Sequence, residues 1–138
     1  MSFGVIIEGE WIMFWIGVTL VMGALGVSLR WLVIGLVGVT SFPWATLGVN
    51  ILGSSLIGVL YAEMVARGGT AWTPLGAALA VGFLGGLTTY SSFSLDALRL
   101  MENGQWSVLT FYILAQNIFC ISACGFSYLT ARYFLSLS

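Results

Sequence analysis

The stretch GFLGGLTTYSSFS occupies residues 82–94 and joins a pair of glycines to a run of polar residues. Five Ser or Thr residues fall within positions 88–94, and Tyr90 and Phe93 stand among them, three residues apart. The preceding residues are apolar, and the first charged residue that follows is Asp96. Such a segment either packs closely against a neighbouring helix or interrupts a helix.

The composition of the chain places it in a lipid bilayer. Of its 138 residues, 59% are hydrophobic and 7% are charged, and the mean hydropathy is +1.05. A soluble domain carries about 25% charged residues. Histidine is absent and the net charge is −1, so the sequence indicates neither imidazole chemistry nor nucleic-acid binding. We therefore predict a multi-pass protein of the cell membrane that is not an enzyme.

Charged residues divide the chain into four apolar segments. No Asp, Glu, Lys or Arg occurs in residues 11–29, 31–62, 68–95 and 103–131. A transmembrane helix needs about 20 apolar residues, and Thr73-Pro74 is typical of a helix start. These signals predict an all-α membrane protein, a single domain over residues 1–138, with helices at about 11–36, 44–66, 73–98 and 105–134.

The arginines leave the orientation of the chain open. Lysine is absent, and with four spans Arg30 and Arg99 fall on one side of the membrane, and Arg67 and Arg132 on the other. A balance of two against two gives no positive-inside preference. Either another signal orients the chain, or copies insert in both directions and pair antiparallel.

Polar residues recur at a spacing of four within the predicted spans. One stripe comprises Thr46, Asn50 and Ser54, and another comprises Tyr112, Gln116, Cys120 and Cys124. Residues at this spacing share a helix face. Buried amides need partners in hydrocarbon, so these side chains either join helices to one another or line a path. Because three helices carry such groups, we favour a lined path.

The glycine pair favours a break in the third helix. Glycine lowers the cost of leaving the helical conformation, and non-helical backbone is tolerated at membrane depth only within protein or beside a cavity. A break at residues 85–88 would free carbonyl oxygens of the kind that hold cations in transporters. The alternative is an unbroken helix in which the glycines form a packing notch.

The same residues carry a family resemblance. GFLGGLTTYSSFS resembles the signature of the CrcB/Fluc fluoride channels, which reads G-F-x-G-G-x-T-T-F-S-T-F-S. GALGVSLRW (23–31) and FPWATLGVNILGSSLIG (42–58) are similar to the first and second helices of that family. The fourth helix matches only loosely. The resemblance implies an antiparallel, dual-topology homodimer in the lipid bilayer that conducts fluoride passively, exports it and so protects the cell from fluoride toxicity.

The resemblance also assigns roles to individual residues. It implies a structural sodium ion at the centre of the dimer, held by the backbone carbonyls of Gly85 and Thr88. It places the fluoride path along Thr46, Asn50, Tyr90, Phe93, Tyr112 and Gln116, with Cys120 on the same track and Arg30 as a vestibule cation. Tyr90 stands where the family usually has Phe, and Gln116 and Cys120 stand where Ser or Thr is commoner.

Two other classes of protein compete with the channel. A small dual-topology, proton-coupled exporter needs a carboxylate deep in the first helix, whereas Glu8 and Glu10 lie at the outer end of that helix. A non-conducting membrane subunit that packs on a larger partner is the other alternative, although it would leave the polar stripes unexplained.

Overall fold

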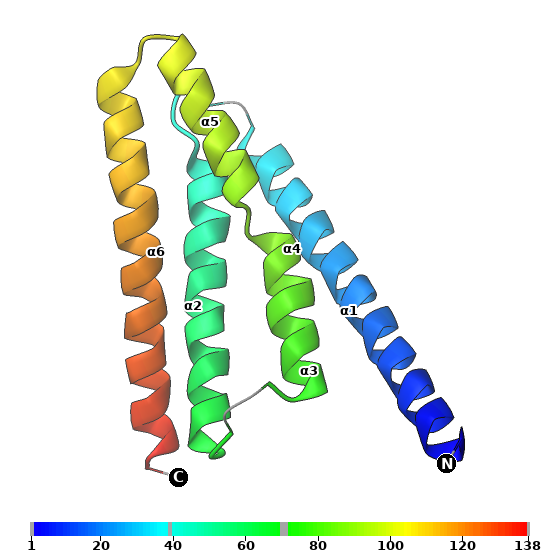
Figure 1. The fold of residues 1–138 in the computed structure, drawn as a ribbon. Helices are drawn as coiled ribbons and strands as arrows, with labels where there is room; N and C mark the ends of the chain where they lie inside the picture. Colours follow the sequence, from blue (N-terminus) through cyan, green and yellow to red (C-terminus); the bar gives the residue numbers. More distant parts are fainter. Residues whose placement is uncertain (1, 39, 70–71, 138) are drawn as a thin grey trace.

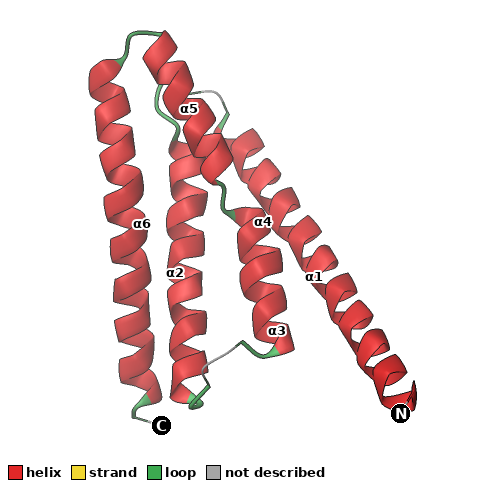
Figure 2. Cartoon of the chain, viewed as in Figure 1, coloured by secondary structure: helices red, strands yellow, loops and turns green. Residues whose placement is uncertain are grey.

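The computed structural model describes residues 2–38, 40–69 and 72–137, with side chains from residue 9 onward. These residues form helices and no strand (Figure 2). The helices are α1 (Ser2–Val37), α2 (Trp44–Ala66), α3 (Pro74–Ala77), η1 (Ala78–Leu84), α4 (Gly85–Leu87), α5 (Tyr90–Glu102) and α6 (Trp106–Leu135). Among the described residues four segments are long and apolar enough to cross a membrane, namely Gly9–Val37, Trp44–Ala66, Pro74–Glu102 and Trp106–Leu135. The prediction of an all-α protein with four apolar spans is confirmed.

Two helix ends differ from the sequence prediction by more than one residue. α1 begins at Ser2 instead of residue 11, because Glu8 and Glu10 continue the helix and do not end it. α5 continues to Glu102 instead of residue 98, and the turn that follows uses Gly104 with a φ of 67°. Charged residues can extend a helix into the headgroup region, so the charge-free windows underestimate both helices.

Successive spans run in opposite directions, so the two termini lie at the same end of the bundle (Figure 1). α2 and α6 run side by side and form the most extensive helix pair of the fold. The Ser127 hydroxyl joins them by donating to the carbonyl oxygen of Ser55 at 2.7 Å. α1 instead packs on η1 and α4 and leans away from the other helices toward its N-terminus.

Close backbone contact holds α1 against the third span. A Cβ atom at Gly86 would stand 2.5 Å from the carbonyl oxygen of Gly23, and one at Gly26 would stand 2.9 Å from the amide nitrogen of Leu87. Small residues allow transmembrane helices to approach at such distances. Only 6% of the most apolar window of α1 is buried, so most of this helix faces outward.

Candidate ion pathway at the helix break

The third span is interrupted at two threonines. α4 ends at Leu87, Thr88 and Thr89 are extended with ψ values of 156° and 117°, and α5 begins at Tyr90. A π-helical segment precedes the break, and the Gly85 amide bonds to the Ala80 carbonyl five residues earlier. The third helix is therefore bent and broken near its middle, as predicted.

The position of the break differs from the prediction by a few residues. Gly85 has helical angles, with φ −63° and ψ −34°, and the extended residues are Thr88 and Thr89. Threonine suits an extended backbone because its branched Cβ restricts the side chain least there. The hydroxyls also cap both half-helices: Thr88 Oγ1 donates to the Leu84 carbonyl at 2.8 Å, and Thr89 Oγ1 accepts from the Ser92 amide at 3.1 Å.

Asn50 of α2 joins the break by two hydrogen bonds. Its Nδ2 donates to the carbonyl oxygen of Thr89 at 3.1 Å, and its Oδ1 accepts from the amide of Thr89 at 2.8 Å. Both residues are buried. The side chain thus replaces the backbone partner that Thr89 would have in a continuous helix. Because one N–H of the Asn50 amide remains beyond this pair, Asn50 can still donate to a second acceptor.

The backbone carbonyls of residues 85–88 lose their helical donors at the break, and those of Gly85 and Thr88 are two of them. In a continuous helix the Gly85 and Thr88 carbonyls would accept from the amides of residues 89 and 92. The Thr89 amide instead donates to Asn50, and the Ser92 amide donates to the Thr89 hydroxyl. The Gly85 and Thr88 carbonyls therefore lack their helical donors, and their role as sodium ligands stays a prediction.

A cavity of about 320 Å³ adjoins the break. It brings together six of the residues selected from the sequence, namely Asn50, Gly85, Thr88, Tyr90, Gln116 and Cys120. The remaining polar residues on its wall are Ser54 and Thr89. Within the described part of the chain its lining contains no charged side chain. The cavity offers neutral hydrogen-bond donors and an aromatic ring.

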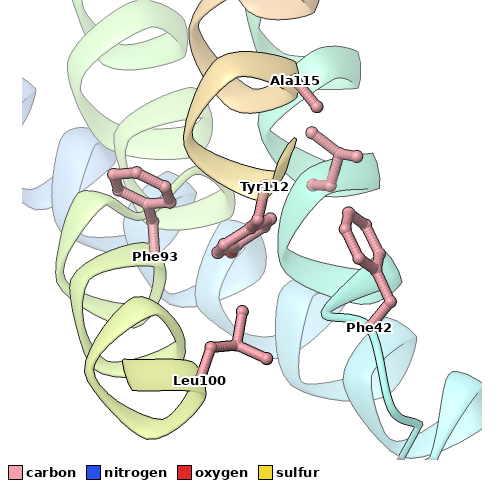
Figure 3. Close-up of a cluster of buried hydrophobic side chains, with 6 residues drawn as sticks. Phe42, Phe93, Leu100, Tyr112 and Ala115 are labelled. Carbon is pink, nitrogen blue, oxygen red and sulfur yellow. The ribbon is translucent and has the colours of Figure 1, made fainter. Parts of the chain in front are cut away.

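Aromatic rings continue from this cavity toward the other end of α5. Tyr90 is exposed, and its ring centroid lies 5.2 Å from that of the buried Phe93. Phe93 in turn lies 5.2 Å from the ring of Tyr112 on α6. Tyr112 is fully buried in an apolar cluster with Phe42, Leu47, Leu100 and Ala115 (Figure 3). Phe93 and Tyr112 therefore lie in the core of the bundle, beside the cavity and outside its lining.

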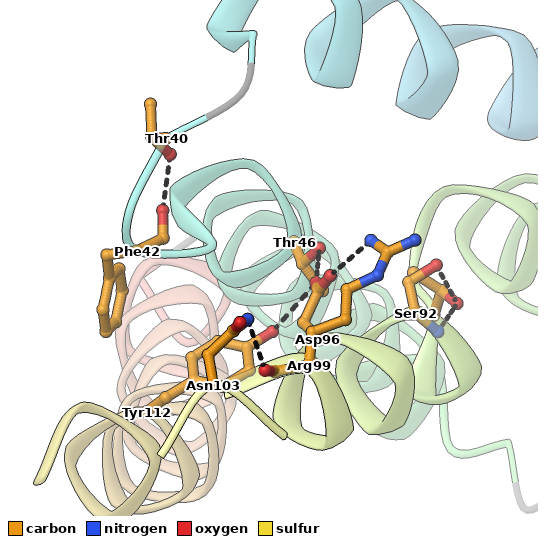
Figure 4. A network of polar contacts seen from close by, with 9 residues as sticks. Thr40, Phe42, Thr46, Ser92, Asp96, Arg99, Asn103 and Tyr112 are labelled. Atoms are coloured by element: carbon orange, nitrogen blue, oxygen red, sulfur yellow. Dashed lines mark hydrogen bonds and ion pairs between the residues drawn. The ribbon is translucent and has the colours of Figure 1, made fainter. Parts of the chain in front are cut away.

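Asp96 is the functional candidate that the sequence analysis missed. Its Oδ2 accepts from the Thr46 hydroxyl at 2.7 Å and from the Tyr112 hydroxyl at 3.5 Å (Figure 4). Its Oδ1 lies 3.6 Å from Arg99 Nη1, and the Asp96 side chain is 18% exposed. From the sequence Asp96 only marked the end of an apolar window. Its position three residues after Phe93, on the same helix face, was the available signal.

A second cavity of about 480 Å³ opens at this end of the bundle. Its polar wall includes Thr46, Ser92, Asp96 and Arg99. Thr46 lies one helical turn from Asn50, so polar side chains continue from this vestibule to the break. Arg30 is half-buried, and among the described residues it has no hydrogen bond or ion pair and lines neither of these two cavities. Its role as a vestibule cation stays a prediction.

Comparison with known proteins assigns the chain to a family. Residues 17–128, which contain the break and all the polar residues of both cavities, match the family described as CrcB-like protein, Camphor Resistance (CrcB). The chain belongs to the CrcB-like family. This family match covers part of α1, all of α2 and the third span, and most of α6. A CrcB-like chain with these four apolar spans is a multi-pass membrane protein.

Several relatives of this CrcB-like chain have a curated name, fluoride-specific ion channel FluC. The relative from Agrobacterium fabrum is 49% identical over 105 residues, which cover 73% of this chain and 82% of the relative. The relative from Rhizobium leguminosarum bv. trifolii is 42% identical over 109 residues, which cover 76% of this chain and 80% of the relative. The relative from Geobacter sp. is 38% identical over 114 residues, which cover 80% of this chain and 91% of the relative.

Proposed function

We propose that the chain is a fluoride-selective channel that lets fluoride leave the cell passively and so confers resistance to it. The observation that carries the proposal is the uncharged, donor-lined cavity at the helix break. It lies in the region shared with relatives named fluoride-specific ion channel FluC. The chain would act as a channel and not as an enzyme.

The chemistry of the cavity suits a small, strongly hydrated anion. Amide and hydroxyl donors can replace the water that fluoride loses, and Asn50 retains one N–H for this purpose. Aromatic edges carry the positive end of the ring quadrupole, so Tyr90 on the cavity wall can face an anion, while Phe93 packs against it outside the lining. The absence of a charged side chain on the described lining also favours conduction, because a conducted ion must be able to leave.

We further propose that the working unit is an antiparallel homodimer that inserts in both orientations. The balanced arginines support dual topology. The helix break and the exposed Tyr90 that follows it support a second copy as partner, because non-helical backbone at membrane depth must be covered by protein or line a cavity. In such a pair the ion path would run between the cavity of one copy and the surface of the other.

A central sodium ion completes this proposal. In this proposal the Gly85 and Thr88 carbonyls of one chain would supply two oxygen donors, and a symmetry-related copy would supply two more. We expect the purified protein to unfold at a lower temperature when sodium is replaced by N-methyl-D-glucamine. Equal unfolding temperatures in the two buffers would contradict a structural sodium ion.

Fluoride efflux from liposomes that contain only this chain tests the function. We expect valinomycin to trigger rapid fluoride release from potassium fluoride-loaded vesicles, with no release of chloride from matched vesicles. Empty vesicles provide the control. Release that requires an opposing proton gradient would instead support a proton-coupled exporter, for which Asp96 is the candidate carboxylate. No release above that of empty vesicles would support a non-conducting subunit.

A further inference from the structure

Gly53 of α2 lies against the side chain of Thr88, the first extended residue of the break. A Cβ atom at Gly53 would overlap Thr88 Cγ2 and would lie 3.7 Å from Thr88 Cβ. Carbon atoms in favourable contact are about 3.5–4.0 Å apart, so residue 53 has room for a hydrogen atom and for nothing larger. Gly53 is buried, and both residues line the cavity at the break. The Thr88 methyl group therefore occupies the space that a side chain at residue 53 would need.

The Thr88 side chain is fixed from two directions. Its methyl group lies toward Gly53, and its hydroxyl donates to the Leu84 carbonyl at 2.8 Å. A threonine side chain has three staggered rotamers, and two of the three place a non-hydrogen atom toward residue 53. Because the Cβ atom of threonine is chiral, the third rotamer takes the hydroxyl away from Leu84 and puts the methyl group in its place. A methyl group at residue 53 would therefore break the hydrogen bond from Thr88 to Leu84.

The backbone at the break cannot move away from α2 without losing other contacts. Figure 1 shows α4 between α2 and α1. On the α1 side, a Cβ atom at Gly26 would stand 2.9 Å from the Leu87 amide nitrogen, so the two backbones already touch there. The next residue along the chain, Thr89, is held by its two hydrogen bonds to Asn50. Thr88 thus lies between two residues that neighbouring helices hold in place.

We propose that Gly53 is a positioning residue of the ion pathway: it accommodates the Thr88 methyl group and so fixes the extended backbone of the third span relative to α2. The inference rests on the proposed anion conduction and adds an apolar position to its polar residues. Asn50, three residues earlier on the same face of α2, holds the backbone of Thr89 by hydrogen bonds. One face of α2 therefore places both extended residues on the cavity wall.

Alanine variants along α2 test the proposal. A Cβ atom at Gly58 would overlap both Ser127 Oγ and the Cys124 carbonyl oxygen, so Gly58→Ala disturbs the packing of α2 on α6 outside the described lining of the cavity. At Gly48 an added Cβ atom meets no described atom within 4 Å. We expect Gly53→Ala to reduce fluoride efflux per folded protein about tenfold, and Gly58→Ala and Gly48→Ala to conduct within about twofold of the parent. Equal losses in Gly53→Ala and Gly58→Ala would overturn the proposal, because general packing would then explain both.

A double variant separates positioning from a loss of folding. Gly53→Ala combined with Thr88→Ser moves one methyl group from residue 88 to residue 53 and conserves the volume of the contact. Serine can keep its hydroxyl on Leu84 with only a hydrogen atom toward residue 53. We expect the double variant to unfold at a higher temperature than Gly53→Ala and to recover the efflux of Thr88→Ser. A double variant as unstable and as slow as Gly53→Ala would overturn the inference.

The parent protein distinguishes this inference from the proposed function. A parent that conducts fluoride, together with a double variant that does not recover, would refute the role of Gly53 and leave the channel intact. A parent that conducts no fluoride would refute the proposed function, and with it the role of Gly53 in a pathway, even where the double variant restores the unfolding temperature.

Discussion

The side chain of Asn50 and the backbone of Thr89 form a reciprocal pair of hydrogen bonds, at 3.1 and 2.8 Å, across 39 residues of sequence. The pair imitates a peptide–peptide contact and closes the gap that the interrupted helix leaves. Asn50 therefore holds the break in place, and its remaining N–H can serve the ion. In the proposed channel a single amide would thus both hold the third span in shape and donate to the conducted ion.

We expect Asn50→Ala to reduce fluoride efflux at least tenfold and to destabilise the chain. The substitution leaves the buried amide of Thr89 without a partner, which costs about 1–3 kcal/mol, and removes the donor to the ion. Efflux from liposomes and the thermal unfolding midpoint measure the two effects. Asn117→Ala is the control, since Asn117 is exposed and bonds to the Ile113 carbonyl of its own helix. Near-parental efflux by Asn50→Ala would restrict Asn50 to holding helices together.

For Tyr90 we expect the ring to matter more than the hydroxyl. Its ring lies 5.2 Å from Phe93, which offers only a ring. Tyr90→Phe should therefore conduct much as the parent does, and Tyr90→Ile should conduct about tenfold less. Tyr133→Ile, at an exposed tyrosine near the end of α6, is the control. Loss of efflux in Tyr90→Phe would show that the hydroxyl, and not the ring, contacts fluoride. Normal efflux in Tyr90→Ile would show that Tyr90 serves only in packing.

We expect Asp96 to contribute to stability because its carboxylate accepts from two hydroxyls, those of Thr46 and Tyr112. Asp96→Ala leaves the buried Thr46 hydroxyl without its acceptor at 2.7 Å, and we expect a loss of about 1–3 kcal/mol. Asp96→Asn keeps an acceptor oxygen and should lose less. The thermal unfolding midpoint compares both with Glu102→Ala, which changes an exposed carboxylate at the end of α5. An Asp96→Ala protein as stable as Glu102→Ala would show that the contact contributes nothing.

The glycine contacts between α1 and the third span predict a steric effect. Gly86→Ala would place a methyl group 2.5 Å from the Gly23 carbonyl oxygen, so the helices must separate. Overpacking of this kind costs about 1–3 kcal/mol, and we expect less folded protein after heating, measured by size-exclusion chromatography. Gly125→Ala is the control, because no atom lies within 4 Å of the added Cβ there. Equal recovery of the two variants would show that a methyl group at Gly86 does not disturb the packing of α1 on the third span.

Dual topology predicts labelling from both sides of the membrane. We would replace both native cysteines with serine and introduce Asn103→Cys in the connection between α5 and α6. An impermeant maleimide should then label part of the population in intact cells and the remainder only after the membrane is opened. Labelling of the whole population from one side would show a single orientation.

The four spans could be predicted because each is bounded by local signals. Pro43 precedes α2 and Gly68, with a φ of 70°, follows it, and the prediction of 44–66 coincides with the helix. The break was harder to locate. The glycines suggested it at 85–88, but Gly86 is used for contact with α1, and this use depends on a neighbouring helix that the local sequence does not reveal.

The sequence predicts which residues lie on a polar helix face, but it does not predict the partners of their polar contacts. A spacing of four placed Asn50 on a polar face, but nothing in the periodicity indicates that its partner is the backbone of Thr89. The same applies to the Thr46–Asp96 contact, which joins residues 50 apart. Sequence periodicity identifies which side chains face inward. Which residues of two helices contact each other depends on how far one helix is shifted along its axis relative to the other. This shift follows from the packing of the whole bundle.

The Asn50–Thr89 pair has a consequence for biosynthesis. The ribosome completes α2 before it reaches the third span, so we expect the amide of Asn50 to enter the membrane before Thr89. The backbone of Thr89 can therefore exchange its hydrogen bonds to water for hydrogen bonds to Asn50 as it enters the lipid. There an unsatisfied backbone group costs several kcal/mol. In a circularly permuted chain, with the third span made first, Thr89 would wait without that partner. The order of the helices along the chain would thus give the interrupted backbone a hydrogen-bond partner while the third span is being inserted.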